Sequence, residues 1–79
     1  MKLSTSTDAA RAILHELNLC GEAMIRIDLL PYTFSTEAEG AYISAFWPDA
    51  DGLPTTVNLY SRADLLDLLD GCTDFYTID

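Results

Sequence analysis

The chain has 79 residues, of which 49% are hydrophobic, and a formal net charge of −9 at pH 7. A chain of this length forms one domain, residues 1–79, and its apolar content is too high for a disordered acidic tail. The negative charge argues against direct binding to nucleic acid or to an anionic membrane, because both would repel it. We therefore expect a basic protein as the partner.

A helix over about residues 8–19 is the first predicted element. A cluster of helix-capping residues at 4–8 precedes it, and Gly21 is a natural stop. Its apolar positions follow a period of 3.6 residues, and they are Ala10, Ile13, Leu14, Leu17 and Cys20. His15 lies off this stripe and is expected to be a solvated surface residue rather than a catalytic base.

Alternating apolar and polar residues over 23–30 predict a strand that ends at Pro31. The polar segment 33–40 is expected to be a connection, and 41–47 a second strand. The following sequence "PDADGLP" contains two prolines and an Asp-Gly pair, which indicates a turn. Residues 55–60 are predicted to be the third strand.

A second helix follows in "SRADLLDLLDG", where Ser61 is the expected N-cap, Asp64 completes a capping-box variant and Gly71 ends the helix. Residues 75–78 are expected to add a short last strand at most. The predicted order is therefore α-β-β-β-α(-β). We predict an α+β fold of two layers, with an antiparallel sheet of three or four strands and both helices on one face.

Sequence motifs of enzymes are not found: the chain has no phosphate-binding glycine loop, no nucleophile elbow and one histidine. Asp49 and Asp51 in "DADG" do not complete a calcium loop, because the glycine comes too early. The sequence thus predicts no enzyme, no metal site and no cofactor. Cys20 and Cys72 are expected to be reduced thiols, with a disulfide or redox pair as the alternative. No segment predicts a membrane span or a signal peptide, so we expect a complete cytoplasmic protein.

Acidic residues concentrate in the second half of the chain. Residues 1–36 hold four acids and three bases, whereas residues 37–79 hold nine acids and one base, Arg62. On the second helix Asp64, Asp67 and Asp70 recur every three residues, which predicts a ridge opposite the leucines. Like charges at this spacing repel, and no lysine on the helix offsets the repulsion. We therefore interpret the ridge as functional rather than as a feature that only increases solubility.

Aromatic residues allow a second hypothesis. The chain has four tyrosines and Trp47, and two helices on one sheet face would leave some of these side chains on the other face. Such a face is typical of protein interfaces. It would make the chain a non-enzymatic adaptor or subunit instead of an inhibitor.

A small chain with the acidic stretches "RADLLDLLDG" and "TEAEG…PDADG" and no enzyme motif resembles phage-encoded anti-CRISPR proteins in size, charge and layout. This resemblance implies an inhibitor that imitates DNA and blocks a basic nucleic-acid channel of a CRISPR effector in a bacterial host. The charge pattern itself supplies the predicted partner-binding residues, which are Asp64, Asp67, Asp70, Asp74, Glu37, Glu39, Asp49 and Asp51. The sequence does not predict the oligomeric state.

Overall fold

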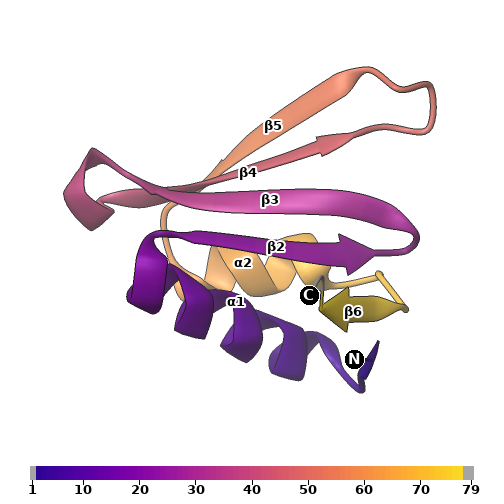
Figure 1. Ribbon diagram of the computed structural model, residues 1–79, viewed down its shortest axis with the longest axis horizontal. Helices are drawn as coiled ribbons and strands as arrows, with labels where there is room; N and C mark the ends of the chain where they lie inside the picture. The colour runs from indigo at the N-terminus through magenta and orange to yellow at the C-terminus, as the bar shows by residue number, and fades with distance from the viewer. Residues whose placement is uncertain (1, 78–79) are drawn as a thin grey trace.

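The computed structural model describes residues 2–77, which form one antiparallel sheet with two helices packed on it. The elements in chain order are β1 (Lys2–Leu3), α1 (Ser6–Cys20), β2 (Glu22–Ile27), β3 (Leu30–Glu37), the short 3-10 helix η1 (Ala38–Gly40), β4 (Tyr42–Pro48), β5 (Pro54–Leu59), α2 (Arg62–Leu69) and β6 (Phe75–Thr77). The strand order across the sheet is β1-β6-β2-β3-β4-β5. Figure 1 shows both helices on the same side of the sheet. The predicted α+β class is confirmed.

The described sheet has six strands, whereas three or four were predicted. The prediction of one strand over residues 23–30 is wrong, because β2 ends at Ile27 and β3 begins at Leu30. The expected polar connection over 33–40 is wrong for the same reason, since β3 continues to Glu37. The predicted last strand is confirmed as β6, and its final predicted residue, Ile78, lies outside the described residues.

A two-residue turn of Asp28 and Leu29 joins β2 to β3. Both residues have positive φ, 49° and 73°, as the tightest hairpin turns require. Such turns are usually Asn-Gly or Asp-Gly, and here an exposed leucine occupies the second position. The alternating pattern therefore ran through the turn without the glycine that would have revealed it.

Pro31 lies inside β3, next to this turn, without interrupting the pairing. Ile27 and Leu30 close the hairpin, and the Thr36 amide further along donates to the Gly21 carbonyl. Because hydrogen-bonded pairs alternate along an antiparallel ladder, the Pro31 nitrogen points away from β2. The pairing of β3 with β4 starts only at Thr33. The proline therefore costs the sheet no hydrogen bond.

Helix α1 starts two residues earlier than predicted and has well-defined ends. The Thr5 hydroxyl accepts a hydrogen bond from the Asp8 amide at 3.1 Å, and Gly21 adopts φ 80° at the C-terminal end. The buried side chains of α1 are Ala9, Ala10, Ile13 and Leu17. They pack with Phe34, which is fully buried at the centre of the sheet. The strand order places β5 at one edge of the sheet.

Candidate partner-binding surface

Helix α2 carries three of the predicted site residues, and the structure gives them different surroundings. Asp67 and Asp70 are exposed, whereas Asp64 is half-buried. Asp70 is not helical, with φ −65° and ψ 133°. It is the C-cap residue, and its backbone amide donates a hydrogen bond to the Leu66 carbonyl. The expected continuous ridge is thus reduced to Asp67 on the helix and Asp70 at its end.

The Asp64 carboxylate helps to cap the N-terminal end of α2. Its Oδ2 accepts a hydrogen bond from the Tyr60 amide at 2.9 Å, while the Asp64 amide donates to the Ser61 hydroxyl at 3.2 Å. These two bonds are the predicted capping box, except that the carboxylate reaches the residue before the N-cap. A substitution of Asp64 therefore changes the helix as well as the surface charge.

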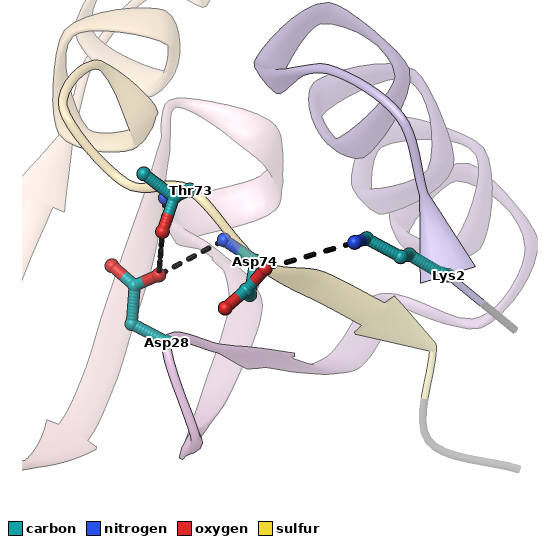
Figure 2. A network of polar contacts seen from close by, with 4 residues as sticks. All are labelled: Lys2, Asp28, Thr73 and Asp74. Atoms are coloured by element: carbon teal, nitrogen blue, oxygen red, sulfur yellow. Dashed lines mark hydrogen bonds and ion pairs between the residues drawn. The ribbon is translucent and has the colours of Figure 1, made fainter.

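Asp74 belongs to a polar cluster that sequence reasoning did not find (Figure 2). Oδ1 of Asp28 accepts hydrogen bonds from the Thr73 amide at 3.0 Å, the Thr73 hydroxyl at 3.1 Å and the Asp74 amide at 2.9 Å. The Asp28 amide donates in return to the Asp74 carbonyl. The amides of Asp74 and Thr73 hold the pKa of Asp28 below its ordinary value. We call these three residues the Asp28 clasp.

Next to the clasp, an ion pair links β1 to the segment that precedes β6. The Lys2 ammonium lies 3.8 Å from the Asp74 carboxylate and 6.0 Å from the centre of the Tyr76 ring. Asp74 is half-buried here, so its charge is partly compensated within the fold. In the sequence Asp28 sits in "IDLLPY", where only its tolerance of positive φ could have signalled the turn.

The remaining predicted acids occupy two separate corners of the sheet. Asp49 and Asp51 lie in the turn between β4 and β5, where the Asp49 carboxylate accepts from the amides of Asp51 and Leu53, both at 2.9 Å. Glu37 and Glu39 lie at the turn between β3 and β4, at the opposite end of β4. Because β4 has seven residues, the two corners are roughly 20 Å apart. The structure therefore does not gather all eight acids into one patch.

Strand β5 connects the turn that carries Asp49 and Asp51 to the helix that carries Asp64 and Asp67. It forms one edge of the sheet, and the turn that joins β4 to β5 projects beyond the helices (Figure 1). Asp49 and Asp51 precede its first residue, while Asp64 and Asp67 follow its last. A shallow groove of about 370 Å³ runs between α2 and β5, and its lining is Val57, Asn58, Leu59, Asp64, Asp67 and Leu68. We refer to it as the α2–β5 groove.

A second hollow, of about 380 Å³, lies between α1 and β2. It contains His15, Glu16 and Cys20, but no group of three side chains within residues 2–77 is placed to hold a metal ion. The Cys20 thiol donates to the carbonyls of Glu16 and Glu22. Its contacts are local to the end of α1.

The two thiols are both free, and β2 separates them. Cys20 precedes β2, whereas Cys72 lies beside Asp28 at the other end of that strand. Six residues of strand span roughly 20 Å, far beyond the reach of a disulfide. Burial, reinforced by the Asp28 carboxylate, raises the pKa of Cys72. The alternative of a disulfide between these residues is therefore wrong for this fold.

The sheet face away from the helices is mixed in character. Phe46 and Met24 are exposed on it, at 46% and 57%, and Thr33 pairs with both. The Tyr42 and Tyr60 rings lie 5.4 Å apart at one end. Trp47 and Tyr32 instead stack with their ring centres 4.5 Å apart on the helix side. Core packing thus accounts for part of the aromatic content and leaves a small apolar strip.

No protein-family model, curated protein or solved structure matches the chain. In the described part of the chain, neither helix has the length and apolar character to cross a membrane.

Proposed function

We propose that this protein is a small acidic inhibitor that binds a basic, nucleic-acid-binding surface of a larger effector and blocks access of DNA or RNA. The observation that carries the proposal is the uncompensated acid beside the α2–β5 groove. Within residues 2–77, the ion pairs are those of Lys2 with Asp74 and of Arg11 with Asp8. Asp67 and Asp70 are exposed, and no basic side chain of the described residues lies within 4.0 Å of them.

Charge on this surface supports a basic partner for a physical reason. A groove built from lysine and arginine binds the phosphates of nucleic acid, and counterions are released. Carboxylates on a rigid helix can neutralise the same basic side chains and release counterions in the same way. Repulsion among neighbouring acids is relieved when a basic surface covers them, so the unpaired state favours association. A CRISPR effector complex in the bacterial cytoplasm is the target that the resemblance in size, charge and layout suggests.

The test is a competition experiment with a purified CRISPR effector complex and fluorescent target DNA. We expect the protein to displace the DNA with an affinity that falls steeply as salt rises from about 50 to 200 mM. The variant Asp67→Lys is expected to weaken displacement by at least about tenfold. Glu16→Lys is the matched control, because it makes the same charge change on the exposed surface of α1.

Asp67 is preferred to Asp64 as the reporter, because Asp64 also caps α2. Circular dichroism of each variant checks that the fold is retained. Displacement that is absent, or that is equal for Asp67→Lys and the wild type, would rule out the acidic-surface mechanism.

The second candidate function is a non-inhibitory adaptor that binds through the sheet face opposite the helices. The exposure of Met24 and Phe46 across Thr33 favours it. Its binding would tolerate salt and would fail in the variant Phe46→Ser. Salt dependence therefore separates the two functions in the same titration.

A further inference from the structure

In the described part of the chain, no strand pairs with the outer edge of β5. Pro54 occupies its first position, and the residues after it, Thr55–Leu59, are all uncharged. Natural sheets usually protect such edges with charged side chains, bulges or very short strands. The opposite edge of the sheet is β1, which has only two residues. The two edges therefore differ in their capacity to pair with another strand.

The direction of the β5 backbone groups follows from the turn. The Asp49 amide donates to the Leu53 carbonyl at 2.8 Å, which fixes this pair as hydrogen-bonded. Because hydrogen-bonded pairs alternate along the ladder, Thr55, Val57 and Leu59 face β4. The amides and carbonyls of Thr56 and Asn58 then point outward. These four groups form a template for one further strand.

Both ends of this template are closed. Pro54 has no amide to offer at the first outward position. At the last one, the Tyr60 amide already donates to the Asp64 carboxylate. The available edge thus spans Thr56–Asn58, with the α2–β5 groove beside Val57. A pairing segment would need about five extended residues, roughly 17 Å.

We propose that the edge of β5 receives an extended, basic segment of a partner protein as an added strand. Main-chain hydrogen bonds to Thr56 and Asn58 would hold the segment, and apolar side chains would pack on Val57 and Leu68 in the groove. Lysine or arginine flanking the paired residues would face the carboxylates at the two ends of β5. This inference rests on the proposed function only for the sign of the partner's charge.

A second copy of the chain is the competing occupant, and charge disfavours it. Two β5 edges paired antiparallel would place the end near Asp64 and Asp67 of one copy beside the Asp51 end of the other. Acid would then face acid in a dimer whose subunits each carry −9. A basic segment meets the same positions with opposite charge.

The test is a nuclear magnetic resonance titration of the full chain, labelled with nitrogen-15. The probe is the peptide acetyl-Lys-Lys-Val-Thr-Val-Thr-Val-Lys-Lys-amide, and its control has glutamate in place of all lysines. We expect saturable shifts at the amides of Thr56 and Asn58 with the basic peptide alone. Thr56→Pro, which removes one outward amide, is expected to weaken binding by about tenfold or more. Thr56→Ala, which keeps the amide, is expected to bind as the wild type does.

Two N-methylated peptides make the result independent of whether the proline variant folds. One carries methyl groups on alternate amides, and the other on the remaining amides. Only one set of amides faces β5 in a paired strand, so one peptide is expected to lose binding and the other to keep it. Equal binding of the two peptides, or shifts at β5 that appear with protein concentration alone, would overturn the inference.

The same titration separates this inference from the proposed function. If Asp67→Lys weakens binding while Thr56→Pro and both methylated peptides leave it unchanged, the edge inference fails and the acidic surface remains. If the acidic peptide binds as well as the basic one, the assignment of a basic segment is wrong, and support for a charge-driven function is lost with it.

Discussion

The Asp28 clasp leads to a prediction about stability that could not be derived from the sequence. One carboxylate oxygen accepts three hydrogen bonds from the segment that links α2 to β6. Asp28→Asn is the clean substitution, because asparagine tolerates the positive φ at this position and keeps one acceptor oxygen. It removes only the charge, whereas alanine would add backbone strain.

The expected cost is modest because Asp28 is exposed. Hydrogen bonds to a charged group contribute about 1.5–3 kcal/mol where solvent is excluded, and solvent screening reduces this value. Carboxylates that accept amide bonds at helix starts contribute about 0.5–2 kcal/mol. We therefore expect Asp28→Asn to lower the free energy of unfolding by about 1 kcal/mol at pH 7. For a domain of this size the melting temperature should fall by roughly 4–8 °C.

The pH dependence gives the sharper test. Because the folded state lowers the pKa of Asp28 from 3.8, its contribution is complete above that value and is lost as the pH falls through the lowered pKa. The difference in unfolding free energy between the wild type and Asp28→Asn should be constant from about pH 7 to 5 and shrink towards pH 3. Urea unfolding followed by circular dichroism measures it. Asp51→Asn, an exposed acid in the β4–β5 turn, controls for net charge. A difference that did not change with pH would refute the role of the carboxylate.

Three further predictions follow from particular positions. Leu29→Gly should raise the free energy of unfolding by about 0.5–1 kcal/mol in urea titrations, because Leu29 has φ 73° and its side chain is 79% exposed. Iodoacetamide at pH 8 should alkylate Cys20 before Cys72 by mass spectrometry, because Cys20 is exposed and burial raises the pKa of the Cys72 thiol. Asp70→Lys should raise the melting temperature slightly, since a cation suits the C-terminal end of α2, and should weaken displacement of DNA from the effector.

The sequence predicted both helices, because each has a clear apolar stripe and chemically distinct ends. Ser61 and Asp64 form the capping interaction expected from their spacing, and Gly21 ends α1 with φ 80°. Such signals act within one helical turn, so they can be read from neighbouring residues alone. A short last strand was predicted as an optional addition, and β6 is that strand.

The hairpin between β2 and β3 could not be predicted, because its turn uses Asp-Leu where a glycine was expected. The periodicity of residues 23–30 continues across the turn, and Pro31 suggested an end instead of a second strand. What stabilises this turn is the clasp between Asp28 and Thr73, residues 45 positions apart. Contacts of this kind leave no pattern in the local sequence.

The acids of this chain divide according to where their carboxylates are used. Those of Asp28, Asp49 and Asp64 accept backbone amides, so folding explains them without any partner. Within residues 2–77, the carboxylates of Asp67 and Asp70 form no hydrogen bond or ion pair, and at the helix end an acid opposes the dipole. The two side chains therefore do not help the fold, and in the proposed function a basic surface covers them. The same reasoning makes the α2–β5 groove, between them and an open strand edge, the place where partner binding should first be measured.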